Sequence, residues 1–306
     1  MKNRVPTVSL TQNGPSLSRL VYGCWRLHED PEGATSDRIL RKIEHCLELG
    51  IHSFDHADIY GDYENEERFG NSLKLKPSLK DSITIVTKCG IQAPVNSRPE
   101  VKTKYYDTSE TYIINSVERS LRKLNVDKID LLLIHRPDPL SDPNEVANAF
   151  NKLKQEGKVQ HFGVSNFSTS QFRLLQSRLD FSLSTNQIEL HPLHLSPFLD
   201  GTVDQAQEYR FRPMTWSPTA GGRIFNPKEK NQILLLQTLN TIASDKNKKP
   251  DQILYAWLLK HPAGFLPILG TNDKQRIEDA ANSLDIELSK QEWFQIWEAG
   301  SGRPVP

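Results

Sequence analysis

Short apolar runs rich in β-forming residues recur along the whole chain, and longer segments with helical spacing of apolar residues separate them. The runs predict eight strands, at residues 20–22, 52–55, 83–88, 129–135, 162–165, 185–189, 213–217 and 266–269. Helices are predicted at residues 36–49, 64–75, 109–124, 145–155, 168–178, 199–209, 234–243, 251–259 and 274–283. This alternation is typical of a parallel sheet whose strands are joined by crossover helices.

A closed (β/α)8 barrel, the TIM barrel, is the economical arrangement of eight such units, and it accommodates residues 1–306 as a single domain. The run from Ile129 to Ile134 is apolar at all but one position, as expected for a strand buried on both faces. An open doubly wound sheet could be built from the same elements. The first strand, however, is followed by Gly23-Cys24-Trp25-Arg26 and not by the glycine pattern of dinucleotide-binding folds.

A β-hairpin is predicted ahead of the barrel. The segments Val5–Leu10 and Pro15–Leu20 flank Asn13-Gly14, a pair that favours a tight turn between antiparallel strands. We expect this hairpin to close the floor of the barrel.

The charge balance excludes some classes of partner. Lysine plus arginine number 38, as do aspartate plus glutamate, so the formal net charge is zero. This balance provides no electrostatic basis for binding nucleic acid or an anionic membrane. The segment MKNRVPTVSL lacks the apolar stretch of a secretion signal, and no apolar run approaches the ~18 residues of a membrane span. We therefore expect a cytoplasmic protein.

Neither the cysteines nor the histidines predict a metal site. Cys24, Cys46 and Cys89 form no Cys-x-x-Cys pair and no even set for a disulfide framework. His191 and His194 are close in sequence, but Pro192 lies between them and no third ligand is evident. We expect no bound metal.

Polar residues stand where the apolar patterns of several predicted strands end. They include Asp55, with Tyr60 five residues later, Lys88 and His135. In (β/α)8 barrels the reactive groups lie at the carboxyl ends of the strands. Each residue alone has an ordinary structural explanation, such as a turn cap, a half-buried aromatic ring or a surface charge. Their joint occurrence after three consecutive strands predicts an active site.

These four residue types suit the reduction of a carbonyl group. Hydride transfer to carbon leaves negative charge on the oxygen, which must receive a proton. Tyr60 can donate that proton, although a phenol has a pKa of about 10. We expect the ammonium of Lys88 to favour the phenolate and lower this pKa, and Asp55 to keep Lys88 charged. His135 would hydrogen-bond to the carbonyl oxygen.

Several segments carry a family resemblance. Phe54-Asp55-His56-Ala57-Asp58-Ile59-Tyr60-Gly61, Val86-Thr87-Lys88-Cys89-Gly90, Leu133-Ile134-His135-Arg136-Pro137-Asp138, Gly163-Val164-Ser165-Asn166-Phe167, Asn186-Gln187-Ile188-Glu189, Trp216-Ser217-Pro218 and Gly270-Thr271-Asn272 occur in this order. The chain resembles the aldo-keto reductases from about Val21 to Arg276, and its spacing is similar to a bacterial subgroup of oxidoreductases. The resemblance implies NADPH-dependent reduction of a small aldehyde or ketone.

The same resemblance implies a set of cofactor-binding residues. Ser165, Asn166 and Gln187 would bind the nicotinamide carboxamide, and Trp216 would stack on its ring. The full set is Gly23, Cys24, Trp25, Ser165, Asn166, Gln187, Trp216, Ser217, Gly221, Gly222, Gly270, Thr271, Asn272 and Arg276. Arg276 would distinguish NADP from NAD by contacting the 2′-phosphate. The sequence departs from many relatives here, because Gly270 stands where some have lysine.

Two other functions remain open at this level. Some barrels of this type bind nicotinamide cofactors and regulate a partner with little turnover. Lys88 and Asp55 could also form a Schiff-base pair in an unrelated barrel enzyme. The polar segment 91–107, the side chain of Trp25 and the tail from residue 300 would shape the substrate pocket.

Overall fold

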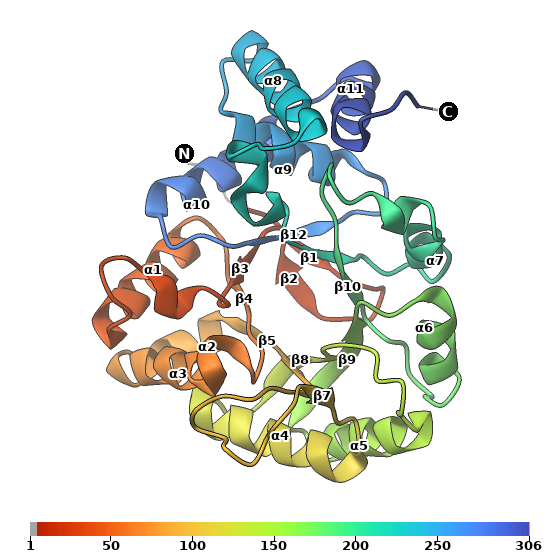
Figure 1. Cartoon of the computed structure of the whole chain (residues 1–306). Coiled ribbons are helices and arrows are strands. Elements are labelled where there is room, and N and C mark those ends of the chain that lie inside the picture. Colours follow the sequence, from red (N-terminus) through yellow and green to blue (C-terminus); the bar gives the residue numbers. More distant parts are fainter. Residues whose placement is uncertain (1–4, 306) are drawn as a thin grey trace.

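Eight parallel strands close into a barrel in the computed structural model, which describes residues 5–305 (Figure 1). The strands, in the order in which they neighbour one another, are β3 (Val21–Gly23), β4 (Ser53–Asp55), β5 (Thr84–Cys89), β8 (Ile129–Ile134), β9 (Val159–Ser165), β10 (Asn186–Glu189), β11 (Met214–Trp216) and β12 (Leu266–Leu269). β12 pairs with β3 and closes the ring. The predicted (β/α)8 barrel is confirmed, and all eight predicted strands are present.

Helices surround the barrel (Figure 1). Their bounds are α1 (Ser36–Glu48), α2 (Tyr60–Tyr63), α3 (Asn65–Leu75), α4 (Glu110–Leu124), α5 (Pro143–Gln155), α6 (Thr169–Gln176), α7 (Thr202–Glu208), α8 (Lys230–Asp245), α9 (Pro250–Lys260), α10 (Lys274–Ala281) and α11 (Lys290–Ser301). Each of the nine predicted helices is found. Helix α7 begins three residues later than predicted, because a 3-10 turn over Ser196–Phe198 and a left-handed Gly201 precede it.

Two structural features lie outside the predicted pattern. The loop after β5 contains a small antiparallel pair, β6 (Ile91–Gln92) and β7 (Tyr105–Tyr106), within a segment predicted only to be long and polar. Helix α11 packs on α8 beyond the last predicted helix. Neither changes the barrel, but the β6–β7 pair brings residues of segment 91–107 to the barrel mouth.

The predicted hairpin closes the floor of the barrel. It is formed by β1 (Thr7–Ser9) and β2 (Ser16–Ser18). The side chains of Leu10 and Leu17 are buried in the cluster that fills the barrel interior. The turn differs from the expected type, because neither Asn13 nor Gly14 has a positive φ and the closing hydrogen bond runs from the Gly14 amide to the Thr11 carbonyl.

The barrel interior is apolar near the floor and polar near the carboxyl ends of its strands. The apolar cluster contains Leu10, Leu17, Val21, Val86, Leu131, Leu133, Met214, Leu266 and Ile268. Above it lie the buried polar side chains of Asp55, Lys88 and Gln187. A buried polar group requires a hydrogen-bond partner. The polar side chains at this level therefore form a connected network instead of packing independently.

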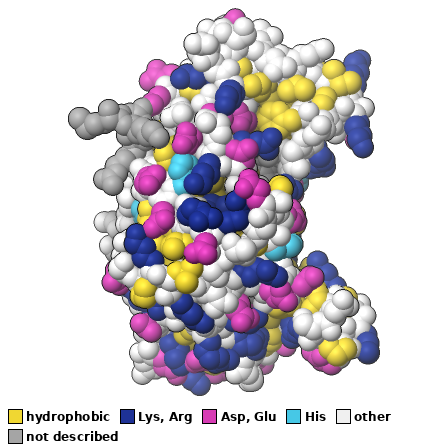
Figure 2. All heavy atoms as spheres, turned by 90° about the vertical axis from the view of Figure 1, so that its left-hand side faces the viewer, with side chains coloured by type: hydrophobic (Ala, Val, Ile, Leu, Met, Phe, Trp, Pro, Cys, Tyr) yellow, Lys and Arg dark blue, Asp and Glu magenta, His cyan; other side chains and the backbone are white. Residues whose placement is uncertain are grey.

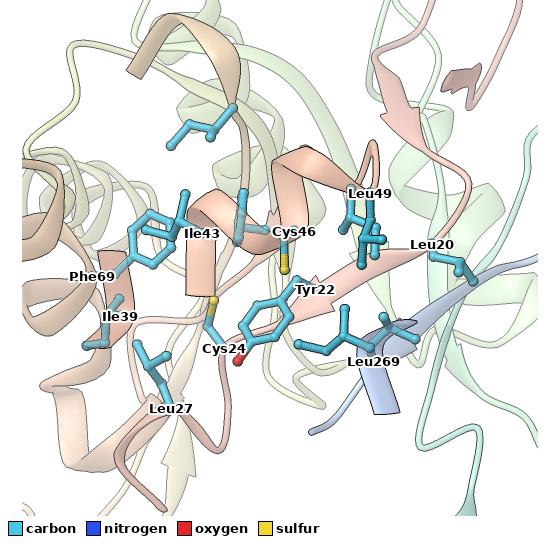
Figure 3. Close-up of a cluster of buried hydrophobic side chains, with 14 of the residues drawn as sticks. Leu20, Tyr22, Cys24, Leu27, Ile39, Ile43, Cys46, Leu49, Phe69 and Leu269 are labelled. Carbon is cyan, nitrogen blue, oxygen red and sulfur yellow. The ribbon is translucent and has the colours of Figure 1, made fainter. Parts of the chain in front are cut away.

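The outer core packs the barrel strands against the helices. Figure 3 shows one such cluster, in which Tyr22 of β3 lies among Ile43 and Cys46 of helix α1 and Leu49, the residue that follows this helix. On the outer surface of this side of the molecule, cationic and anionic side chains are interspersed (Figure 2). None of the helices within residues 5–305 combines the length and the apolar character that crossing a membrane requires.

Candidate active site

Lys88 is the centre of the polar cluster at the barrel mouth. Its side chain is fully buried, and its Nζ donates hydrogen bonds to Asp55 Oδ2 at 2.7 Å, to the His56 carbonyl at 2.8 Å and to the Tyr60 hydroxyl at 3.0 Å. Strands β4 and β5 are neighbours, so the end of one brings Asp55 to the end of the other. The three side chains that the sequence predicted to act together are in direct contact.

A left-handed turn directs Tyr60 back toward Lys88. Gly61, Asp62 and Tyr63 all have positive φ, between 55° and 69°. A Cβ on Gly61 would lie 2.1 Å from Asn65 Oδ1, so this position requires glycine. The buried Asn65 amide in turn donates to the carbonyls of Cys24 and Trp25, both at 2.9 Å. This contact ties the loop after β3 to the turn that carries the phenol.

The electrostatics keep the cluster in defined protonation states. Burial alone would lower the pKa of Lys88, but Asp55 and Tyr60 together raise it above the ordinary value, so the amine stays charged. Burial raises the pKa of Tyr60 above 10, and this effect exceeds the lowering by the Lys88 ammonium. The expected decrease in the phenol pKa is therefore wrong in this structure. The phenol is fully protonated near neutral pH, as a proton donor must be.

His135 is neutral beside the phenol. The rings of Tyr60 and His135 meet edge to face, with centroids 5.7 Å apart. Burial, followed by the charges of Lys88, Arg136 and Lys104, lowers the pKa of His135 well below 6.5. Its Nδ1 atom is buried without a hydrogen-bond partner among the described residues. A neutral imidazole that lines the cavity can donate one hydrogen bond to a carbonyl oxygen.

A chain of hydrogen bonds connects the Trp216 indole to Asp55. Trp216 Nε1 donates to Asn166 Oδ1 at 3.0 Å, and Asn166 Nδ2 donates to Ser165 Oγ at 2.8 Å. Ser165 Oγ donates to the Gln187 carbonyl at 3.0 Å, and Gln187 Nε2 donates to Asp55 Oδ1 at 2.8 Å. Four of the predicted cofactor-binding residues thus belong to the same network as Asp55, one of the predicted catalytic residues.

These residues line a cavity of about 360 Å³ at the carboxyl ends of the strands. The predicted site residues on its wall are Gly23, Trp25, Asp55, Tyr60, His135, Ser165, Asn166, Gln187, Trp216, Ser217, Gly221 and Gly270. Beyond β11, Ser217, Ala220, Gly221 and Gly222 all have positive φ. A loop of this conformation presents backbone amides to a ligand, and no atom lies within 4 Å of a Cβ built on Gly222. Gly221 lines the cavity, so this loop brings backbone hydrogen-bond donors to that wall.

The comparison with known proteins agrees with this geometry. Residues 19–300 match the Aldo/keto reductase family. The chain belongs to this family.

Several relatives of this aldo/keto reductase match almost its whole length. It is 45% identical over 303 residues to oxidoreductase YdhF of Escherichia coli, with 99% of this chain and 100% of the relative covered. It is 43% identical over 289 residues to a 6-dehydroglucose reductase of Agrobacterium fabrum, with 94% and 96% covered. An aldo-keto reductase of Bombyx mori, solved in complex with NADP, has the same fold, with a TM-score of 0.75 and 24% identity over 97% of this chain and 93% of that chain. The chain is an NAD(P)H-dependent oxidoreductase of the barrel type.

Cys24 of this reductase does not line the cavity. The prediction that it contacts the cofactor is therefore wrong. Side chains alternate along a strand, and the alternation continues past the end of β3. Gly23 and Trp25 face the cavity, whereas Tyr22 and Cys24 face helix α1 in the outer core (Figure 3). Burial raises the pKa of the Cys24 thiol well above its ordinary value, and the same holds for Cys89. Both buried thiols therefore hold little thiolate, the reactive form, near neutral pH.

Asn272 also has a different environment from the one expected. Its Nδ2 donates to the Arg26 carbonyl at 2.7 Å, and its Oδ1 accepts from Lys42 Nζ at 2.6 Å and from the Tyr22 hydroxyl at 3.2 Å. With these contacts the side chain is committed to holding loops together. It lines a separate cavity of about 500 Å³, between α1 and the start of α10.

The remaining predicted residues lie outside the central cavity. Thr271 Oγ1 accepts a hydrogen bond from the amide of Asp273, whose carboxylate caps helix α10 through the Arg276 amide. The Arg276 side chain is exposed. Asp273 therefore occupies the helix terminus that could have received a phosphate. The contact of Arg276 with a 2′-phosphate stays a prediction.

Nine residues of the cavity wall are absent from the predicted set, and four of them lie on one side of the cavity. Ile59, Ile91, Lys104 and Arg136 line the wall on the side of β4, β5 and β8. Arg136 directly follows His135 at the end of a predicted strand, which is a signal that could have identified it. Lys104 and Ile91 belong to segment 91–107, which was predicted to shape the substrate pocket, and the fold shows that these two side chains of the segment line the cavity.

Proposed function

We propose that the protein reduces an aldehyde or ketone to an alcohol with NADPH, and that Tyr60 is the general acid. The contact of Lys88 with both Asp55 and the Tyr60 hydroxyl, next to His135, carries this proposal. The same site would catalyse the reverse oxidation, because a group that donates a proton in one direction accepts it in the other.

The cavity fits a nicotinamide. The half-buried Trp216 ring lines it and offers a face for stacking. Gln187 donates its amide hydrogen to Asp55, and its Oε1 has no hydrogen-bond partner among residues 5–305, so this oxygen is free to accept from the carboxamide. The open loop at Gly221 and Gly222 suits a pyrophosphate. When bound, the reduced nicotinamide supplies a hydride to the carbonyl carbon.

The side chains manage the charge that develops on the carbonyl oxygen. His135 donates a hydrogen bond to this oxygen and orients it. Tyr60 then transfers its hydroxyl proton to the same oxygen, and the resulting phenolate lies 3.0 Å from the Lys88 ammonium. Asp55 holds that ammonium in place. An alkoxide is a much stronger base than a phenolate, so transfer from a phenol of raised pKa remains favourable.

The state of Lys88 weighs against Schiff-base chemistry. A lysine that attacks a carbonyl must be neutral and must have access to the substrate. Lys88 is fully buried, its pKa is raised, and its Nζ makes three hydrogen bonds. These features support its role as a fixed positive charge under Tyr60.

The Tyr60→Phe variant tests the proposal. NADPH oxidation is followed by its near-ultraviolet absorbance with a panel of aldehydes and ketones that includes 6-dehydroglucose, the compound for which two relatives are named. We expect Tyr60→Phe to lose at least about a hundredfold in kcat, with the Kd for NADPH nearly unchanged. Equal kcat for variant and wild type would exclude Tyr60 as the acid. Tight NADPH binding without turnover of any carbonyl compound would instead indicate the regulatory, cofactor-sensing function.

A further inference from the structure

The cavity wall carries an excess of positive charge. Arg26, Lys104 and Arg136 line it, whereas Asp55 is the only acidic residue there. The chain as a whole has equal numbers of cationic and acidic side chains. The excess is therefore a local property of the active site.

No acidic side chain neutralises Lys104 or Arg136. The Asp55 carboxylate already accepts from Lys88 on one oxygen and from Gln187 on the other. Within residues 5–305 neither Lys104 nor Arg136 forms an ion pair. The carboxylates of Asp107 and Asp138, which are close to these cations in sequence, are engaged elsewhere. Asp107 accepts from Ser109, and Asp138 accepts from Thr108 and from the Leu140 amide.

Arg26 belongs to the other end of the cavity. Its guanidinium lies 4.0 Å from the position of a Cβ on Gly221, in the loop assigned above to the pyrophosphate. It also pairs with Glu29 at 3.6 Å. Arg26 therefore faces the proposed cofactor phosphates.

Lys104 and Arg136 stand on the opposite side of the barrel. Lys104 follows β5 and Arg136 follows β8, and in the ring of eight strands β5 lies opposite β11 and β8 lies opposite β12 (Figure 1). The phosphate-side residues Gly221 and Gly270 follow β11 and β12. The backbones of these two residues are therefore across the barrel from the cofactor loops, and the long side chain of Arg136 extends from there to Trp216 at the end of β11.

Both cations are close to the reacting groups. Each contributes to lowering the pKa of His135. Arg136 is the next residue after His135, and its guanidinium lies over the Trp216 ring, 5.4 Å from the centroid. The ring of Trp216 fixes the position of the guanidinium but leaves its charge uncompensated.

We propose that the substrate is a carbonyl compound that carries an anionic group, a carboxylate or a phosphate, and that Arg136 and Lys104 bind this group while the carbonyl oxygen lies at Tyr60 and His135. This inference rests on the proposed reductase function. The planar guanidinium of Arg136 can bind two oxygens of the anion side by side, and Lys104 adds a point charge. Ile59, Ile91 and Trp25 surround the intervening carbon chain with apolar surface.

Matched substrate pairs test the inference. The holoenzyme is assayed with 4-carboxybenzaldehyde against benzaldehyde and methyl 4-formylbenzoate, and with glyceraldehyde 3-phosphate against glyceraldehyde. If charge-assisted hydrogen bonds hold the anionic group, kcat/KM for at least one anionic substrate should be about tenfold or more higher than for its neutral partner. The preference should decrease as the salt concentration rises. The favoured pair identifies the group as carboxylate or phosphate.

Variants connect the preference to the two cations. Arg136→Met and Lys104→Met should each lower the ratio of anionic to neutral kcat/KM toward one. Lys102→Met is the control, because Lys102 is an exposed cation of the same loop that does not line the cavity. It should keep the wild-type ratio.

The outcomes separate the two proposals. Turnover of neutral and anionic partners at equal rates, or an unchanged ratio in both variants, would overturn the anion site. Weaker binding of NADPH by Arg136→Met, with an unchanged ratio, would assign Arg136 to the cofactor and also overturn the anion site.

If no carbonyl compound is reduced, the reductase function fails. Calorimetry then still tests the anion site. We expect the complex of the protein with NADPH to bind 4-(hydroxymethyl)benzoate more tightly than benzyl alcohol, and equal affinities would refute the anion site.

Discussion

Gln187 Nε2 donates a hydrogen bond of 2.8 Å to Asp55 Oδ1 across the axis of the barrel. Strand β10, which carries Gln187, lies opposite β4, which carries Asp55, in the ring of eight strands. Both side chains are buried at the carboxyl ends of their strands. The contact therefore links the proposed cofactor side of the site to the proposed catalytic side, and it gives the second carboxylate oxygen a partner.

Replacing Gln187 should show how much the Gln187–Asp55 hydrogen bond contributes to the free energy of unfolding. Gln187→Leu leaves Asp55 Oδ1 without its donor, and we expect the free energy of unfolding to fall by about 1–3 kcal/mol. Urea unfolding followed by tryptophan fluorescence measures the change. The control Gln160→Leu removes an exposed amide that donates only to the Gly157 carbonyl. Equal stability of the two variants would mean that the Gln187–Asp55 hydrogen bond contributes nothing.

The buried Lys88–Asp55 pair predicts a rescue by a second substitution. Lys88→Met leaves the Asp55 carboxylate buried without its counter-charge, which should cost about 3–5 kcal/mol of stability. Asp55→Asn in the same chain removes the charge and should recover much of that loss. Denaturant unfolding of both proteins provides the test. A double variant less stable than the single one would contradict this account of the pair. Neither variant should reduce carbonyl compounds.

The left-handed turn after Tyr60 predicts a requirement for glycine. The backbone at Gly61 has a φ of 58°, and a Cβ at this position would lie 2.1 Å from Asn65 Oδ1. Gly61→Ala should therefore displace the phenol from Lys88 and lower kcat at least tenfold, with a loss of about 1–2 kcal/mol in stability from the backbone alone. Gly157→Ala has a comparable positive φ and open space around its Cβ, so it should lose stability but retain kcat. Similar kcat in both variants would remove the role assigned to this turn.

A buried carboxyl group under the site predicts the pH dependence of stability. Glu66 accepts hydrogen bonds from Thr87 and Ser120, and burial raises its pKa from 4.5 to about 7. The folded protein therefore binds this proton more tightly than the unfolded chain does. The resulting stabilisation, about 3 kcal/mol at most, is complete below pH 4.5 and is lost as the pH rises through 7.

Glu66→Gln removes this titration. Its free energy of unfolding should decline less between pH 5 and 8 than that of the wild type, as measured by urea unfolding at a series of pH values. Glu67→Gln, an exposed neighbour, should follow the wild-type curve. Parallel curves for all three proteins would show that Glu66 does not titrate in this range.

A substitution at Gly270 should strengthen the preference of the protein for NADPH over NADH. No atom lies within 4 Å of a Cβ on Gly270, and its φ is not in the left-handed range, so a long side chain fits. Gly270→Lys should tighten NADPH binding about tenfold relative to NADH, because it adds a charge near the 2′-phosphate. Arg276→Ala should weaken NADPH more than NADH. Fluorescence titration of the wild type and both variants gives the six dissociation constants. A parallel change for both cofactors in Arg276→Ala would refute the proposed 2′-phosphate contact.

The barrel and the polar cluster of the candidate site could be predicted from sequence because they depend on local patterns. Apolar runs separated by helical segments define eight strands, and their carboxyl ends must lie on one face of a parallel barrel. Asp55, Lys88 and His135 follow directly from those boundaries. Tyr60 was singled out with them and also matched the family resemblance, although its position five residues beyond its strand depends on the turn at Gly61.

Tertiary structure decided which side chains meet across the barrel and which way the loops face. Cys24 lies one residue from the cavity, but strand alternation turns it into the outer core. Asn272 meets Lys42 and Arg26, which are far from it in sequence. Lys104 lines the cavity only because the β6–β7 pair folds its loop over the mouth. The sequence by itself determined the order of strands and the chemistry at their ends, since hydrophobic periodicity is a local property. The direction of each loop side chain depends on contacts between distant segments, and these exist only in the closed barrel.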